Sequence, residues 1–173
     1  MKKYDLIINI LFVGYKLTGK TTLFNRISKN CFNYTYFPTN GADYFGDIKI
    51  INTKRVKINL WDIGNLSSHI LTNYTNKANI VIFFCNLNIH DSQLFILDQL
   101  KSKEYDNKKV YILGNIWKNS NIVICSELST LIYNLNLKIV TINIQNDDMM
   151  IILNFYNDIL IEAMDSKNYE RIS

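Results

Sequence analysis

The chain has 173 residues, a length that fits one domain built around one hydrophobic core. Its 48% hydrophobic and 20% charged residues predict a globular fold, and its formal net charge of +4 comes without the dense basic run that nucleic-acid binding needs. Three cysteines without tight spacing argue against a disulfide framework or a zinc site. We expect a single domain over residues 1–173, with its core over about 5–164 and a tail over 165–173 that frays.

The sequence carries no signal for a membrane anchor. No apolar stretch is long enough to span a bilayer. Residue 2 is Lys2 and the last seven residues contain no Cys, which argues against myristoylation and prenylation. We expect a cytoplasmic protein without a direct lipid anchor, one that reaches membranes only through a partner protein.

Apolar runs of strand length alternate along the chain with amphipathic segments of helix length. Continuous apolar strands between helices indicate a mostly parallel sheet covered on both faces. One early pair of alternating strands, joined by residues 52–54, reads as an antiparallel hairpin. The expected elements, in chain order, are strand 6–13, a helix opening at 20–29, strands 44–52 and 55–61, helix 66–76, strand 80–85, helix 91–100, strand 110–113, helix 126–133, strand 138–144 and helix 149–163.

A glycine-rich pattern joins the first expected strand to the first expected helix. Residues 14–21 read Gly-Tyr-Lys-Leu-Thr-Gly-Lys-Thr, which matches the phosphate-loop pattern G-x-x-x-x-G-K-[ST]. Successive backbone N–H groups and a helix N-terminus form a concave positive site for phosphate. Gly14 permits the sharp turn, and Gly19 lets the backbone approach the ligand. We expect Lys20 to pair with the β- and γ-phosphates and the Thr21 hydroxyl to ligate Mg²⁺.

The remaining residues of the expected phosphate-binding set are Lys16, Leu17, Thr18 and Thr22. Lys16 is a second cation in the loop, and its role has three interpretations. It adds a phosphate contact, it obstructs an arginine finger supplied by a partner, or it points to solvent as lysine side chains usually do.

Residues 32–41 read Phe-Asn-Tyr-Thr-Tyr-Phe-Pro-Thr-Asn-Gly. Together with the phosphate loop, this segment resembles the Ras-like small GTPases, nearest to their Rab- and Ras-type members, and the resemblance spans about residues 5–164. It implies that this segment is the first switch, that Phe32 lies against the base, and that Thr39 closes on Mg²⁺ and the γ-phosphate. For Phe32 and Tyr36 the alternative is an ordinary packing role.

A third segment, Trp-Asp-Ile-Gly-Asn at residues 61–65, resembles the start of the family's second switch, W-D-x-x-G-Q. The resemblance implies that Asp62 holds Mg²⁺ through water. Two alignments stay open. Either one residue is missing, so that Gly64 senses the γ-phosphate and Asn65 takes the water-orienting position, or none is missing and Asn65 and Leu66 fill those two places. Neither alignment supplies the Gln that orients the attacking water, so we expect slow or undetectable hydrolysis.

A fourth segment follows the strand expected at 110–113, where the family has N-K-x-D. Asn115 matches the pattern, whereas Ile116 replaces the Lys that covers the base and Lys118 replaces the Asp that accepts guanine N–H groups. Lys offers only donors, so guanine selectivity should weaken. The family's S-A-K motif, expected near residues 142–144, is absent.

The resemblance therefore implies a three-layer α/β fold of the P-loop NTPase kind, with a mostly parallel six-stranded sheet and one antiparallel edge strand. It also implies GTP or GDP as ligand, Mg²⁺ as cofactor, and effector or complex-partner proteins that bind the switch regions. Our first hypothesis is a divergent GTPase-like switch in intracellular traffic or signalling. The second is a pseudo-GTPase that serves as an interaction subunit, and the third is a P-loop enzyme that uses another nucleotide.

Overall fold

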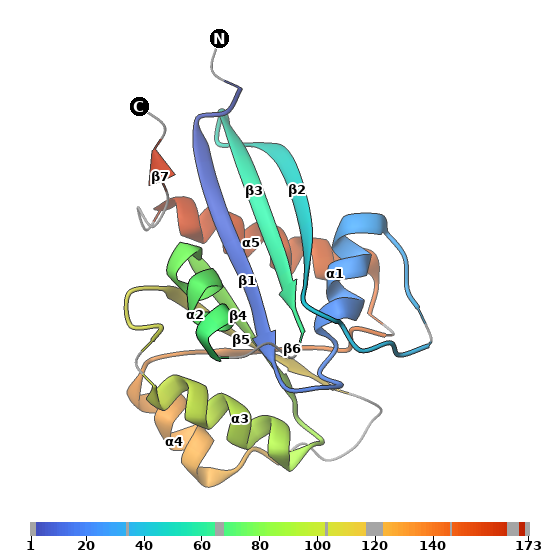
Figure 1. Ribbon diagram of the computed structural model, residues 1–173, viewed down its shortest axis with the longest axis vertical. Helices are drawn as coiled ribbons and strands as arrows, with labels where there is room; N and C mark the ends of the chain where they lie inside the picture. The colour runs from blue at the N-terminus through green and yellow to red at the C-terminus, as the bar shows by residue number, and fades with distance from the viewer. Residues whose placement is uncertain are drawn as a thin grey trace.

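The computed structural model describes residues 3–33, 35–64, 68–102, 104–116, 123–145, 147–165 and 170–171. Strands and helices alternate along the chain, as Figure 1 shows. The strands are β1 (Leu6–Gly14), β2 (Ala42–Ile51), β3 (Lys54–Ile63), β4 (Ile80–Asn86), β5 (Lys109–Asn115), β6 (Ile139–Ile142) and β7 (Glu170–Arg171). The helices are α1 (Lys20–Lys29), α2 (Ser68–Lys77), α3 (His90–Lys101), α4 (Ser126–Asn134) and α5 (Met149–Asp165).

Six strands lie side by side in the sheet in the order β2-β3-β1-β4-β5-β6, and β7 pairs with β1 off this path. All pairings along this path are parallel except that of β2 with β3, which is antiparallel. Parallel strands need crossover connections, and the helices provide them. The carboxyl ends of β1, β3, β4 and β5 therefore meet at one edge of the sheet, where ligands of open α/β sheets bind.

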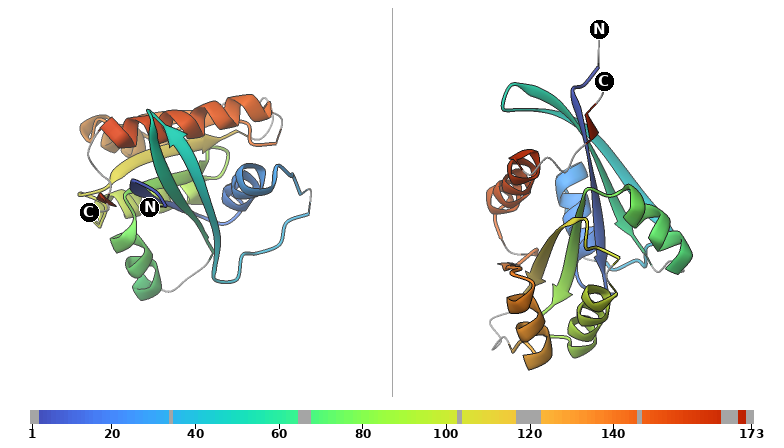
Figure 2. Two further views of the ribbon diagram at one scale, coloured as in Figure 1. Left: turned by 90° about the horizontal axis from the view of Figure 1, so that it is seen from above. Right: turned by 90° about the vertical axis from the view of Figure 1, so that its left-hand side faces the viewer.

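The central strand β1 divides the core into two halves. Its residues 6, 8, 10 and 12 face one side, where α1 and α5 pack and Tyr156 is the largest fully buried side chain. Leu11 and Val13 face the other side, where side chains of α3 and α4 close the core and α2 adds partly buried residues. Figure 2 shows these helices on the two sides of the sheet. The result is the three-layer arrangement that the sequence predicts, and the predicted fold class is confirmed.

The β2–β3 hairpin turns in two residues. Asn52 and Thr53 both adopt left-handed backbone conformations, with φ of 47° and 67°. This is the pattern of a type I′ turn, whose twist matches that of the flanking strands. The sequence predicts this hairpin correctly but begins its second strand one residue late.

Three residues of the expected C-terminal tail, Asp165 and residues 170–171, belong to regular elements, and the rest of that tail lies outside the described residues. Helix α5 continues to Asp165, and β7 pairs antiparallel with residues 6–7 at the start of β1. A two-residue strand has no hydrophobic period that the sequence could show. Its pairing uses backbone groups of β1 that lie before the point where β4 begins to pair.

Candidate functional site

The phosphate loop lies between β1 and α1. Gly14 ends β1, and Gly19 is the N-cap of α1 with a φ of 95°. A Cβ at Gly14 would overlap the carbonyl oxygen of Phe84 on β4, and one at Gly19 would overlap the Asn115 amide. Both positions therefore require glycine, one because of close packing and one also because of its left-handed backbone.

The Lys20 side chain folds back over the loop. Its Nζ donates to the carbonyl oxygens of Gly14 at 2.7 Å and Tyr15 at 2.9 Å. Burial lowers the pKa of the Lys20 ammonium, and the negative charge of Asp62 opposes that shift. A cation held against the loop backbone can exchange these carbonyl bonds for bonds to an anionic ligand.

Three oxygen-bearing side chains meet beside Lys20, and they come from three separate segments. The Thr21 Oγ1 lies 2.5 Å from the Oδ2 of Asp62 and 2.9 Å from the Oγ1 of Thr39. Thr21 has one hydroxyl proton, so when it donates to Asp62 the Thr39 hydroxyl donates to Thr21. The structure thus brings together Thr21, Thr39 and Asp62, the three residues expected to hold a metal.

Asp62 is fully buried, and its Oδ1 has no hydrogen-bond partner among the described residues. Burial raises the pKa of the Asp62 carboxyl, while the Thr21 hydrogen bond and the Lys20 charge lower it. A buried carboxylate oxygen without a partner is costly, and a cation or a water molecule would satisfy it. With two hydroxyl groups beside it, this is the hard-oxygen set that Mg²⁺ prefers, so the residues fit that ion.

The two switch-like segments lie against each other. The Gly64 N–H donates to the Gly41 carbonyl at 2.9 Å. A Cβ at Gly64 would overlap the carbonyl of Thr39, so only glycine fits there in this arrangement. Asn65 and Leu66, on which the choice between the two alignments depends, lie outside the described residues.

Asn115 connects the phosphate loop to the segment after β6. It is buried, its Nδ2 donates to the Thr18 carbonyl at 3.2 Å, and its Oδ1 accepts from the Ile144 N–H at 3.2 Å. Ile116 is half-buried against the core beneath α3 and α4. Lys118 lies outside the described residues. On the base side, the structure thus supports a positioning role for Asn115.

Sequence reasoning missed two residues that brace the same region. The Arg26 guanidinium of α1 donates to the carbonyls of Ile144 at 2.5 Å and Asp147 at 2.8 Å. The Asn86 amide at the end of β4 donates to the Leu17 carbonyl at 3.3 Å. A polar residue directly after the apolar run 80–85 was a usable signal for Asn86. Arg26 gives none, because an arginine in an amphipathic helix usually faces solvent.

The other expected loop residues differ in exposure. Thr18 is buried, and its hydroxyl donates to the Tyr15 carbonyl at 2.8 Å. Thr22 is half-buried and Leu17 exposed. Lys16 is exposed, and its Nζ lies 5.6 Å from the centroid of the Tyr15 ring. The exposure of Lys16 is what the solvent-facing interpretation expects, and its other two interpretations stay predictions.

Phe32 is half-buried, in keeping with either role expected of it. Near the switch-like segments, three aromatic rings form a row across β2, β3 and α2. The ring of Trp61 lies 5.7 Å from that of Tyr44 and 6.3 Å from that of Tyr74. Tyr44 is exposed and the other two are half-buried, so the row presents apolar area to solvent.

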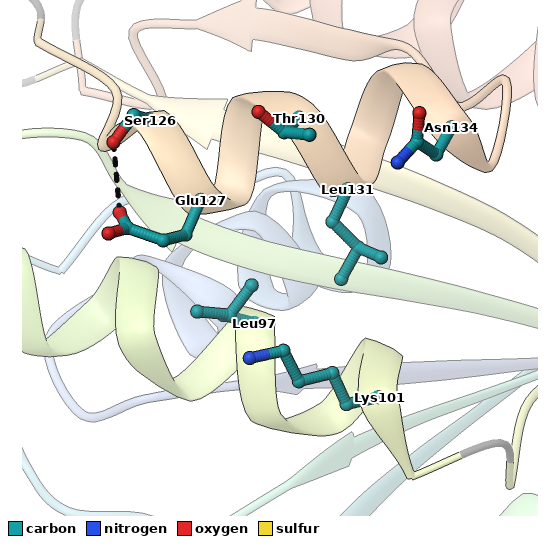
Figure 3. A pocket seen from close by; sticks show the side chains of 7 residues that line it. All are labelled: Leu97, Lys101, Ser126, Glu127, Thr130, Leu131 and Asn134. Atoms are coloured by element: carbon teal, nitrogen blue, oxygen red, sulfur yellow. Dashed lines mark hydrogen bonds between the residues drawn. The ribbon is translucent and has the colours of Figure 1, made fainter.

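Two surface hollows lie away from the phosphate loop. The groove in Figure 3, of about 360 Å³, runs between α3 and α4 and is lined by Leu97, Lys101, Ser126, Glu127, Thr130, Leu131 and Asn134. The second, of about 370 Å³, is lined by residues of α5, β5 and β6. No described helix is long and apolar enough to cross a bilayer.

Comparison with known proteins identifies the family. The model of the Roc domain (Ras of Complex, Roc, domain of DAPkinase) matches residues 9–118. The chain is 26% identical over 119 residues to Ras-related protein Rab-3C of Bos taurus, covering 66% of the chain and 52% of that relative. It is 29% identical over 106 residues to Ras-related protein Rab-28 of Caenorhabditis elegans, covering 60% of the chain and 38% of that relative.

A third relative, Ras-related protein Rab-3A of Homo sapiens, is 27% identical over 119 residues, covering 66% of the chain and 54% of that relative. The chain thus spans about half the length of the Rab-3 relatives and less of Rab-28. These matches confirm the resemblance drawn from the motifs. The chain belongs to the Roc and Ras-like family of small GTPase domains.

Proposed function

We propose that this protein binds a guanine nucleotide with Mg²⁺ at its phosphate loop and acts as a switch in intracellular traffic or signalling. The observation that carries the proposal is the meeting of Thr21, Thr39 and Asp62 beside Lys20. Four polar side chains from three segments converge there around a buried carboxylate oxygen that has no partner among the described residues, an arrangement typical of a ligand site. The traffic or signalling role draws on the likeness to Rab-type proteins.

Each group has a defined task in this proposal. The backbone N–H groups of the loop and the Lys20 ammonium would bind the phosphates, and the hydroxyls of Thr21 and Thr39 would hold Mg²⁺, with Asp62 holding it through water. The chemistry that the metal would supply is neutralisation of charge on the phosphate oxygens. Thr39 belongs to a segment without regular structure, so its contact with Thr21 is the one that the loss of a γ-phosphate would release.

Hydrolysis is expected to be weak or absent in this proposal. The family's water-orienting Gln has no counterpart in either alignment of residues 62–66. Without that group the attacking water is not positioned, even where phosphates and metal are held. The signal would then last until the nucleotide dissociates or a partner supplies the missing group.

The partner surface in this proposal is the exposed side of the aromatic row. Tyr44, Trp61 and Tyr74 come from β2, β3 and α2, next to both switch-like segments. Aromatic side chains are enriched at protein interfaces, because they bury much area with little loss of rotamer freedom. A change in either segment would alter this row directly.

The second candidate is a pseudo-GTPase that serves as an interaction subunit. The observation in its favour is that protein groups satisfy much of the site. Lys20 donates to two loop carbonyls and Gly64 donates to Gly41, so the closed arrangement has internal support. The replacement of the base-recognition Asp by Lys118 points the same way.

Calorimetric titration of nucleotide-free protein with GTP, GDP and ATP separates the two candidates. With Mg²⁺ present, the proposal expects GTP or GDP to bind more tightly than ATP, and chelation of Mg²⁺ to weaken GTP binding. A single-turnover assay with bound GTP should show little phosphate release. Absence of binding by all three nucleotides would reject the switch and leave the interaction subunit.

A further inference from the structure

Strand β2 is a long open edge of the sheet. It pairs with β3 over ten residues without a bulge, from Ala42 opposite Ile63 to Ile51 opposite Lys54. On its other side it has no strand neighbour in the described part of the chain, and it ends the sheet order. Figure 1 shows β2 beside β3 at the outer margin of the sheet. Most proteins avoid long open edge strands by shortening, bulging or covering them, because an open edge can pair with a strand of another chain.

The hairpin turn fixes which backbone groups of β2 point outward. In a two-residue turn, the flanking residues, here Ile51 and Lys54, exchange hydrogen bonds with each other. Odd-numbered residues of β2 therefore bond to β3, and even-numbered residues direct their N–H and C=O groups away from the sheet. The Ile48 N–H agrees with this, since it donates to the Asp47 carboxylate of its own strand at 2.7 Å.

The even-numbered residues also present an apolar row to solvent. Tyr44, Ile48 and Ile50 are 55%, 42% and 78% exposed. The odd-numbered side chains at positions 45, 47, 49 and 51 are half-buried on the side where α5 packs. The open edge thus combines backbone groups that have no strand partner in the described part of the chain with exposed apolar side chains, which are the two components of strand addition.

We propose that β2 pairs antiparallel with β2 of a second copy of this chain, centred on Gly46. In that register Asp43 of one copy lies opposite Lys49 of the other, and Tyr44 lies opposite Ile48. The two-fold symmetry makes each pair occur twice, which gives two opposite-charge pairs and two apolar pairs. The even-numbered residues then exchange hydrogen bonds, as their outward direction requires.

Charge selects this register over its neighbours. A shift by two residues in one direction sets Asp43 opposite Asp47, and a shift in the other sets Asp47 opposite its own copy. Like charges directly opposite each other destabilise a strand pair. A shift by one residue would bring inward-bonded groups to the edge. A register centred on Ile48 would also set Asp47 opposite Lys49, but it pairs only residues 45–51, whereas the register centred on Gly46 pairs residues 42–50. The longer pairing favours the register centred on Gly46, and the self-complementary charges of the edge favour a second copy as the occupant.

Asp47 sets the strength of the association. Its carboxylate occupies the Ile48 N–H, which the second copy needs, so pairing must displace it. The proposed contact is confined to one strand per copy, whereas permanent complexes use larger interfaces. The dimer is therefore weak and depends on concentration.

Sedimentation velocity over a concentration series tests the proposal with a pair of charge reversals. The wild-type chain should shift from monomer toward dimer as its concentration rises. Asp43→Lys and Lys49→Asp should each stay monomeric, because each sets like charges opposite each other. An equimolar mixture of the two variants should associate like wild type, since both charge pairs are then restored between unlike copies. Lys54→Asp, the same reversal outside the paired segment, should leave association unchanged.

Thermal melts check that each variant folds, because Lys49 also contacts Asn157 and the Tyr156 ring. If Lys49→Asp fails to fold, Asp43→Lys alone carries the test, with Asp43→Asn expected to show intermediate association. A wild-type chain that stays monomeric at every concentration would overturn the proposal. The proposal would also be overturned if the single charge reversals associated like wild type, or if the mixture of the two folded variants failed to regain association. The outcome does not depend on nucleotide binding.

Discussion

The phosphate side and the base side of the candidate site differ in what holds them together. On the phosphate side, Lys20, Thr21, Thr39 and Asp62 contact one another or the loop backbone, and one carboxylate oxygen stays unsatisfied. On the base side, Asn115 is satisfied at both ends of its amide by Thr18 and Ile144.

This difference means that the two sides would respond differently to a substitution. In the proposed site, phosphate recognition draws mainly on backbone N–H groups and the Lys20 ammonium, which the glycines and Lys20 supply. Base recognition in the family pattern N-K-x-D draws on one carboxylate, and the matching residue here is Lys118. Asn115 differs from Lys118 in that its hydrogen bonds join parts of the protein itself.

The largest expected effect is on the phosphate side. Lys20→Ala removes the cation that pairs with the phosphates, and we expect nucleotide affinity to fall about 100-fold or more. Calorimetric titration with GDP and Mg²⁺ measures it. Lys16→Ala is the matched control, since Lys16 is an exposed cation of the same loop and its removal should have little effect. Equal losses in both variants, with both folded, would contradict the assignment of Lys20.

The next largest effect is expected on Mg²⁺ affinity. Asp62→Asn keeps the size of the side chain but removes its charge, so Mg²⁺ affinity in the nucleotide complex should fall about 10–100-fold. Titration of Mg²⁺ into the protein–GDP complex measures it. Asp98→Asn, at an exposed position on α3, should leave Mg²⁺ affinity unchanged. An unaltered Mg²⁺ response in Asp62→Asn would show that the metal is held elsewhere.

Asn115→Ala tests whether the hydrogen bonds of Asn115 on the base side stabilise the fold. Its loss leaves the buried Thr18 carbonyl and Ile144 N–H without their amide partner, so the free energy of unfolding should fall by about 2 kcal/mol. Urea denaturation without nucleotide measures this. Asn134→Ala, an exposed amide on α4, should change it by less than about 0.5 kcal/mol. Equal stability of both variants would remove the structural role of Asn115.

The smallest effect on binding is expected at position 118. Lys118→Asp restores an acceptor where the guanine N–H groups need one, so the preference for GTP over ATP should rise about tenfold. Competition between the two nucleotides, before and after the change, measures it. Lys118→Ala is the control, because it removes the ammonium without supplying an acceptor. An unchanged preference in Lys118→Asp would place the base away from this segment.

The sequence predicts those elements well that have a local sequence pattern. The buried strands and the hairpin each have a hydrophobic period, and the phosphate loop has fixed residue types at a fixed spacing between β1 and α1. Helix ends are less well predicted, and α5 ends two residues later than expected. Ends depend on caps and tertiary contacts that the period does not contain.

The parts of the site that escaped prediction depend on contacts distant in sequence. Arg26 meets Ile144 and Asp147 across more than a hundred residues, and only the packing of α1 beside the start of α5 brings them together. Each of Thr21, Thr39 and Asp62 is predicted from a separate sequence motif. The hydrogen bonds among them depend on the order of the strands, which the motifs alone do not give.

The β2–β3 turn also has a consequence for the free energy of unfolding of the whole domain. Thr53 is a β-branched residue at a φ of 67°, where its Cβ crowds the backbone and non-glycine residues lose about 1–2 kcal/mol. Thr53→Gly should therefore raise the free energy of unfolding by about 0.5–1 kcal/mol, whereas the same change at Thr130 in α4 should lower it by a similar amount. Urea denaturation of the two variants compares them. A higher free energy of unfolding in Thr53→Gly would show that the domain can be stabilised at the hairpin turn without a change in either side of the candidate site.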